Sequence, residues 1–133
     1  MTASKQDLVK AAGTARNNAY CRYSGYRVGA ALVDDKGNMH VGCNVENSAF
    51  PEGTCAEANA IAAMIASGGK IIQSIVVIGG EDAVEDCTPC GGCRQKIAEF
   101  ADNNTQIVLV GADNGLTNYT IDDLLPVSFS LRG

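Results

Sequence analysis

Three cysteines in two distant segments place the strongest constraint on how this 133-residue chain can fold. The first segment reads Thr54-Cys55-Ala56-Glu57, and the second reads Pro89-Cys90-Gly91-Gly92-Cys93-Arg94-Gln95. Cys90 and Cys93 are three residues apart, so their sulfurs share one face if this segment is helical. If Cys55 joins them, the fold must bring two helix starts together around one metal ion.

A set of three thiolates describes an open zinc site. A structural zinc usually has four protein ligands, whereas a hydrolytic zinc has three and keeps the fourth place for water. Glu57 follows Cys55 by two residues and is placed to handle the protons of such a water. We therefore predict Cys55, Cys90 and Cys93 as ligands of Zn²⁺ and Glu57 as the general base.

Other interpretations of these segments remain open at this stage. Thr54 and Glu57 have the spacing of a capping box, in which Glu57 would only satisfy a backbone N–H. Cys90 and Cys93 also fit a thioredoxin-like redox pair at a helix start. Cys87 lies three residues before Cys90 and would complete a closed four-cysteine zinc site. Pro89 separates it from the helical register, which favours Cys87 as a small buried residue.

The net charge and the N-terminal sequence limit the kinds of partner that the protein can bind and where in the cell it is expected. The net charge is −5 and no run of Lys or Arg occurs, so the chain lacks an electrostatic footprint for a nucleic-acid polymer. The N-terminal residues lack the apolar core of a signal peptide, and no window reaches transmembrane length, so no membrane partner is expected. Six cysteines without an export signal are better explained as thiols and metal ligands than as disulfides. We expect a cytoplasmic protein with a small-molecule partner.

The hydrophobic pattern predicts a single domain over residues 1–133. The order of its elements predicts a mixed sheet with helices on both faces. Helices are expected at residues 4–17, 55–66, 89–100 (with Thr88 as cap) and 121–125, and strands at residues 27–34, 39–45, 75–78, 106–110 and 116–120.

Several residues outside the cysteine segments also attract attention. Asn44 and Glu46 are two residues apart at a strand end, so their side chains project from one face. They either bind a ligand or only form a solvated strand end. His40, the only histidine, has no further metal-ligand candidate near it in sequence and is expected at the surface. Gly91 and Gly92 cost a first helical turn about 1 kcal/mol each relative to Ala, which suggests that a metal or ligand approaches the backbone there.

The two cysteine segments resemble the zinc motifs of the cytidine deaminase family, in its short form with an all-cysteine zinc. Zinc deaminases hold the metal with one His and two Cys or with three Cys, and use a Glu that is not a ligand as acid and base. The likeness covers almost the entire chain. It includes three further segments: Tyr23-Ser24-x-Tyr26-x-Val28-Gly29-Ala30-Ala31-Leu32, Asn44-Val45-Glu46-Asn47 and Leu124-Leu125-Pro126-x-x-Phe129.

This resemblance implies a fold and an activity. The fold would be a three-layer α-β-α sandwich with a five-stranded mixed sheet, assembled as a homotetramer. The activity would be zinc-dependent hydrolytic deamination of cytidine and deoxycytidine to uridine and deoxyuridine in pyrimidine salvage, with release of ammonia. We hypothesise that a zinc-bound hydroxide attacks C4 of cytosine while Glu57 shuttles the proton.

The resemblance also implies roles for substrate-binding residues. Asn44 and Glu46 would hold the sugar hydroxyls, and the backbone of Ala56 would face the edge of the base. Tyr26 stands where the family usually has Phe in the substrate pocket. Phe129 of one subunit would stack on the base bound by another.

The chain departs from the family pattern at one residue near the metal, and a second family of deaminases offers an alternative substrate. The family commonly has Arg after the catalytic Glu, where it offsets the thiolate charge, but this chain has Ala58. Partial positive charge at the two helix N-termini would have to compensate. The nearest enzymatic rival is an aminonucleoside-antibiotic deaminase of the blasticidin type. The Asn44-Val45-Glu46-Asn47 match argues against that rival.

Overall fold

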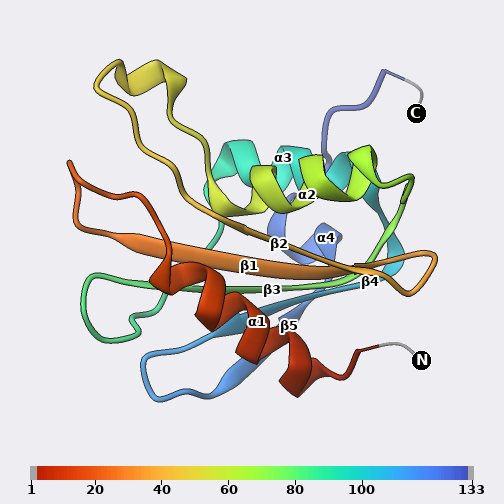
Figure 1. Cartoon of the computed structure of the whole chain (residues 1–133). Helices are drawn as coiled ribbons and strands as arrows, with labels where there is room; N and C mark the ends of the chain where they lie inside the picture. The colour runs from red at the N-terminus through yellow and green to blue at the C-terminus, as the bar shows by residue number, and fades with distance from the viewer. Residues whose placement is uncertain (1–2, 132–133) are drawn as a thin grey trace.

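The computed structural model describes residues 3–131, which form a five-stranded mixed sheet with helices on both faces (Figure 1). The predicted three-layer fold class is therefore confirmed. β3 and β4 are parallel, and all other neighbouring strands are antiparallel. The strands follow the order β2 (Met39–Cys43), β1 (Arg27–Asp34), β3 (Ile72–Gly80), β4 (Ala101–Val110) and β5 (Leu116–Tyr119).

β3 lies in the middle of the sheet, as its unbroken apolar run predicts. Its side chains alternate between two separate hydrophobic clusters. Ile75 and Val77 face the cluster under α2, α3 and α4, while Val76 and Ile78 face the cluster under α1. The strand buries both faces because helices cover both sides of the sheet.

Helix α1 (Lys5–Asn17) covers one face alone. Ser4 and Asp7 form the expected capping box at its start. The helix packs so closely on β1 that a Cβ added at Gly29 would lie 2.0 Å from the carbonyl oxygen of Ala12. A glycine at this position therefore lets helix and strand backbones meet.

The opposite face carries α2 (Ala56–Ala66), α3 (Gly91–Phe100) and the short α4 (Ile121–Leu124). Ala60, Met64 and Ile97 are fully buried between these helices and the sheet. α2 and α3 lie side by side above the sheet and start at the same end of it (Figure 1). Within residues 3–131, no helix has the length and apolar character needed to cross a bilayer.

Both helix starts differ from the predicted ones by one or two residues. Cys55 has an extended backbone and is the N-cap of α2, so the helix itself begins at Ala56. Cys90 is likewise the extended N-cap of α3, so Pro89 and Thr88 lie before the helix. The prediction that Thr88 caps a helix beginning at Pro89 is therefore wrong. An extended N-cap is the normal geometry, and here a cysteine occupies it in both helices.

β4 (Ala101–Val110) is longer than the predicted strand at residues 106–110. The prediction missed its first half because the residues there are mostly polar. The strand starts at Ala101, directly after α3, and its pairing with β3 shifts register between Ile72 and Ser74. At this register shift the Thr105 hydroxyl donates a hydrogen bond to the carbonyl oxygen of Ile72 at 2.6 Å, which joins the two strands. The exposed polar residues of this stretch hide the strand from a reading of hydrophobic periodicity.

The hairpin between β1 and β2 turns where the sequence predicts, with Gly37 at φ +82°. The prediction of a surface histidine at position 40 is wrong. The His40 side chain is only 9% exposed, and its Nε2 lies 2.8 Å from Oδ2 of Asp34.

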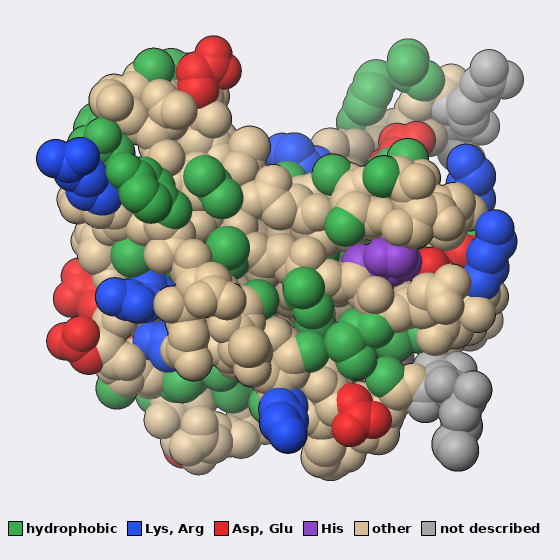
Figure 2. Space-filling view, in the orientation of Figure 1, with side chains coloured by type: hydrophobic (Ala, Val, Ile, Leu, Met, Phe, Trp, Pro, Cys, Tyr) green, Lys and Arg blue, Asp and Glu red, His purple; other side chains and the backbone are tan. Residues whose placement is uncertain are grey.

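Two segments project on the side of α2 and α3. One contains the 3-10 helix η1 (Phe50–Glu52), and the other is the C-terminal segment that follows α4. Figure 2 shows that the molecular surface is hollowed between them, over the two helices. Large apolar side chains on these segments are exposed, namely Phe50, Val127, Phe129 and Leu131.

Candidate metal centre

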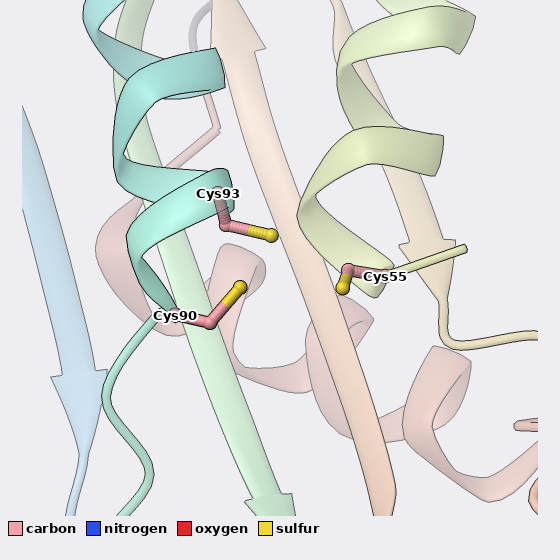
Figure 3. Close-up of side chains that lie close together, drawn as sticks. All are labelled: Cys55, Cys90 and Cys93. Carbon is pink, nitrogen blue, oxygen red and sulfur yellow. The ribbon is translucent and has the colours of Figure 1, made fainter. Parts of the chain in front are cut away.

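The sulfur atoms of Cys55, Cys90 and Cys93 all lie within 4.8 Å of one another. Figure 3 shows the three side chains pointing toward a common centre, Cys55 from the start of α2 and the other two from the start of α3. With Zn–S bonds of about 2.3 Å, two sulfurs on one zinc are at most about 4.6 Å apart, and about 3.8 Å in a tetrahedral site. The donor set and its spacing therefore fit zinc, with small movements of the side chains.

Two helix N-termini surround this cluster. Cys55 and Cys90 are the N-caps of α2 and α3, and Cys93 lies in the first turn of α3. Unpaired N–H groups and the helix dipoles place partial positive charge there, which favours thiolates. Cys93 is buried, whereas Cys55 and Cys90 are exposed, so the cluster is open to solvent on one side.

The surroundings of the three thiols shift their pKa values in different directions. The backbone N–H of Cys93 stabilises the Cys90 thiolate and lowers the pKa of that thiol. Burial, followed by the negative charges of Glu57 and Cys55, raises the pKa of Cys93. Burial is also the main cause that raises the pKa of Cys55. The thiols therefore resist losing all their protons together unless a cation such as Zn²⁺ balances the charge.

Glu57 is buried beside the sulfurs in the first turn of α2 and is only 4% exposed. Burial raises the pKa of its carboxyl group above the ordinary value, although the Cys93 thiol and the Lys96 charge oppose this rise. A buried carboxyl group with a raised pKa, beside three converging thiols, has the properties of a general acid and base.

The capping-box interpretation of Glu57 is wrong, because Cys55 and not Thr54 is the N-cap. The Thr54 hydroxyl instead accepts a hydrogen bond from the side-chain amide of Asn59 at 3.0 Å. No side-chain hydrogen bond caps the start of α2.

Cys87 lies outside the cluster of three sulfurs. It packs against β3, where its Sγ is 2.7 Å from the place that a Cβ at Gly79 would take. Burial and a hydrogen bond with Cys87 raise the pKa of Tyr26 to about 12. In this structure Cys87 partners Tyr26 and does not close a four-cysteine site.

Asn44 is engaged with the backbone of β1 and the residues before it. Its Oδ1 accepts the N–H of Val28 at 2.8 Å, and its Nδ2 donates to the carbonyl oxygen of Tyr26 at 2.9 Å. The expectation of a solvated strand end therefore does not hold for Asn44. Its amide fixes the segment that presents Tyr26.

Glu46 holds the adjacent part of the same segment. Its carboxylate accepts the N–H groups of Tyr23 and Ser24, at 2.9 and 3.0 Å, and the Ser24 hydroxyl. The Ser24 hydroxyl is the main cause that lowers the pKa of Glu46. Glu46 also lines an open pocket of about 400 Å³. The other lining residues are Tyr23, Ser24, Asn47 and Phe50.

The remaining residues of the predicted site lie in different surroundings. Ala56 is fully buried, so only its backbone, at the start of α2, can face a ligand. Phe129 is exposed on the C-terminal segment, where its carbonyl oxygen accepts a hydrogen bond from Gln95 at 3.2 Å. Within this single chain, the Phe129 ring therefore lies free on the surface.

Sequence reasoning missed two cations that support the site. Arg16 of α1 donates to the carbonyl oxygens of Gly80, Asp82 and Ala83, in the loop that leads to the second cysteine segment. The signal was its spacing of four residues from Ala12, on the buried face of α1. Lys96 acts electrostatically on Glu57 and lies four residues after Gly92, one helical turn.

Comparison with known proteins gives a consistent result. Residues 2–110 match the family model described as "Cytidine and deoxycytidylate deaminase zinc-binding region". A cytidine deaminase from Sporosarcina psychrophila is 35% identical over 94% of this chain and 90% of its own length. The crystal structure of a Burkholderia pseudomallei cytidine deaminase superposes with a TM-score of 0.86 at 35% identity, covering 96% of this chain and all of the other.

A protein of the rival class is also similar, but less so. A blasticidin-S deaminase from Bacillus cereus is 27% identical over 79% of this chain and 78% of its own length. The likeness to the cytidine deaminases is thus higher in identity and reaches farther along the chain.

Proposed function

The chain belongs to the cytidine and deoxycytidylate deaminase family, and from this premise we propose that it is a zinc-dependent cytidine deaminase. It would hydrolyse cytidine and deoxycytidine to uridine and deoxyuridine and release ammonia. One observation carries the proposal. Three sulfurs from two helix starts converge beside the buried carboxyl group of Glu57, and Cys87 leaves the fourth ligand place open.

Cys55, Cys90 and Cys93 would hold the zinc, which when bound supplies a water molecule made acidic enough to act as a nucleophile at neutral pH. Three thiolates make this effect weaker than three neutral histidines do, so a nearby base is needed. Glu57 is the base. Its carboxylate takes a proton from the water, holds it on a carboxyl oxygen, and delivers it to N3 of the pyrimidine.

Glu57 then takes the remaining proton from the oxygen now bonded to C4 and passes it to the amine, so that the C4–N bond breaks, C4 becomes a carbonyl carbon and the leaving group is ammonia. A carboxyl group that must both accept and donate protons works best when its pKa is close to the ambient pH. The burial of Glu57 moves its pKa in that direction. The protein thus prepares the carboxyl group for both roles by excluding water from it.

Substrate binding is proposed for Asn44, Glu46, Tyr26, the backbone of Ala56 and Phe129. Glu46 supports this proposal most directly, because its carboxylate lines the open pocket and can accept hydrogen bonds from sugar hydroxyls. Asn44 and Tyr26 are tied to each other and to β1, so they would act as one rigid unit. Phe129 would complete the site of a neighbouring subunit.

Assembly and setting are part of the same proposal. The exposed apolar side chains on the η1 and C-terminal segments suit burial between copies of the chain, as expected for a homotetramer. Figure 2 shows Lys and Arg side chains scattered over one face without a continuous basic stripe, which supports a nucleoside rather than a nucleic-acid polymer as substrate. We place the enzyme in pyrimidine salvage in the cytoplasm.

The test is the ultraviolet change of cytidine incubated with the zinc-loaded protein, beside the same preparation stripped of metal. Conversion to uridine only with zinc is the expected result. Blasticidin S, assayed in the same way, tests the rival substrate. Conversion of blasticidin S but not of cytidine would overturn the substrate assignment, and no conversion of either would overturn the proposed reaction.

A further inference from the structure

We propose that Lys96 supplies the positive charge that offsets the anionic cysteine cluster, from helix α3 rather than from the residue after Glu57. This inference rests on the proposed zinc site. It concerns a residue to which neither the cysteine motifs nor the substrate segments assign a role.

The charge balance of the site calls for a cation. Zinc brings two positive charges, three thiolates bring three negative ones, and ionised Glu57 adds a fourth. α2 carries no Lys or Arg, and position 58, beside Glu57, is Ala. α3 carries two cations, Arg94 and Lys96. Any full positive charge that these two helices add to the partial charge of their N-termini therefore lies on Arg94 or Lys96.

The Arg94 side chain forms hydrogen bonds with backbone carbonyl groups. Its Nε donates to the carbonyl oxygen of Pro89 at 2.8 Å, and its Nη1 donates to the carbonyl oxygen of Leu124 at 2.9 Å. These bonds fasten the start of α3 to α4. Lys96, in contrast, has no ion pair with a carboxylate anywhere in residues 3–131.

The Lys96 ammonium reaches back toward the start of α3. A Cβ added at Gly92 would lie 3.7 Å from Nζ of Lys96 and 4.0 Å from Sγ of Cys90. The ammonium and this sulfur therefore flank the same small space and can be no farther apart than the sum of those two distances. Helical side chains lean toward the N-terminus, which places residue 96 over residue 92.

Gly92 marks the place where the two groups come together. Outside its chain neighbours and its own helix backbone, only the Lys96 ammonium and the Cys90 sulfur lie within 4 Å of the place of a Cβ at Gly92, both at ordinary van der Waals contact distances. Ala58 and Lys96 also line the same open groove between α2 and α3, so a small residue at 58 leaves that groove free for the lysine.

The test follows from the charge of the zinc-loaded site. Zinc and three thiolates together carry a net charge of −1, since +2 and −3 sum to that. A nearby cation stabilises this loaded site. Lys96→Gln should therefore weaken zinc binding about three- to tenfold at low salt, the size expected for one charge several ångströms away in partly hydrated protein. Competition with a chromophoric chelator measures this affinity.

Three comparisons separate charge from structure. Lys96→Arg should restore zinc affinity, and so should Ala58→Arg in the Lys96→Gln background, because it returns a cation from the other wall of the groove. The difference from the unaltered protein should shrink at about 1 M salt, where charges are screened within about 3 Å. Lys10→Gln, on α1 across the sheet, makes the same charge change and should leave affinity unaltered.

The possible outcomes distinguish this inference from the proposed function. If the unaltered protein binds no zinc, the proposed metal site itself fails. If it binds zinc and Lys96→Gln binds equally well, or if the loss is neither salt-dependent nor restored by either arginine, only the role of Lys96 is overturned.

Discussion

Nε2 of His40 lies 2.8 Å from Oδ2 of Asp34, across the first hairpin. The other carboxylate oxygen of Asp34 accepts the N–H groups of Lys36 and Asn38, at 2.8 and 3.0 Å. Asp34 is only 1% exposed. One buried carboxylate therefore fixes the end of β1, the turn and the start of β2 together.

Asp34 should make the stability of the fold sensitive to acid. Burial alone would raise its pKa, but the hydrogen bonds from His40, Asn38 and Lys36 outweigh burial and lower it. A carboxyl group with a depressed pKa in the folded state stabilises the fold above its unfolded pKa of about 3.9, and this stabilisation is lost as the pH falls through the folded value. Denaturant titrations between neutral pH and about pH 2 measure the effect.

Asp34→Asn should lower the free energy of unfolding at neutral pH by about 1–3 kcal/mol, because it leaves buried donors poorly matched. The variant should also lose less further stability in acid than the unaltered protein. Asp122→Asn, at an exposed position on α4, is the matched control and should change little. Parallel pH profiles for the Asp34 variant and the unaltered protein would contradict the role of Asp34.

Replacement of Glu57 by Gln should abolish turnover while zinc stays bound. The amide keeps the size of the side chain but cannot accept and return a proton, so a loss of at least about 10²–10⁴ in kcat is expected. Steady-state kinetics and metal content of the same sample give the answer. Full activity with zinc bound would exclude Glu57 as the general base.

Cysteine substitutions should separate the ligands from the bystander. Cys55→Ser removes one of the three converging sulfurs and should reduce zinc affinity strongly, since structural and catalytic zinc sites depend on each thiolate. Cys87→Ser removes a sulfur that partners Tyr26 and should leave the zinc content unaltered. Metal analysis after gel filtration compares them. Loss of zinc from Cys87→Ser would revive a four-cysteine site.

Two glycine substitutions should change stability in opposite directions. Gly29→Ala drives a methyl group into the backbone of α1, 2.0 Å from the carbonyl oxygen of Ala12, and should destabilise the fold by about 3 kcal/mol. Gly13→Ala meets nothing within 4 Å inside α1 and should stabilise it by about 0.5–1 kcal/mol. Thermal unfolding of both variants tests how tightly α1 packs on the sheet.

Much of the fold could be predicted because each element carries a local signal. The unbroken apolar run around Val76 marks a central strand, and Gly37 marks the hairpin turn. The cysteine segments predicted which sulfurs would converge, because Cys55, Cys90 and Cys93 can bind one zinc ion only if the fold brings them together. The hydrophobic pattern also indicates five strands, and the match to family motifs implies the same number.

The rest depended on contacts between residues that show no pattern in sequence. The polar first half of β4 is a strand because Thr105 bonds to Ile72 on its neighbour. The sequence did not show that the amide of Asn44 forms hydrogen bonds with the backbone on both of its sides. In the sequence Lys96 looks like an ordinary exposed helical lysine. Only the structure shows that its ammonium group lies near Gly92 and the Cys90 sulfur. Such roles are set by tertiary neighbours.

Arg16 links the two faces of the sheet. It belongs to α1, on the face opposite the cysteines, yet its guanidinium group holds three carbonyl oxygens of the loop that delivers Cys87 and Cys90. The same loop is also held by the bridge between Gly79 and Glu85 and by hydrogen bonds to Asp86 and Pro89. Variation in the N-terminal helix is therefore not neutral with respect to catalysis. A laboratory evolution of this protein would find substitutions near Arg16 that change metal retention while lying on the far side of the molecule.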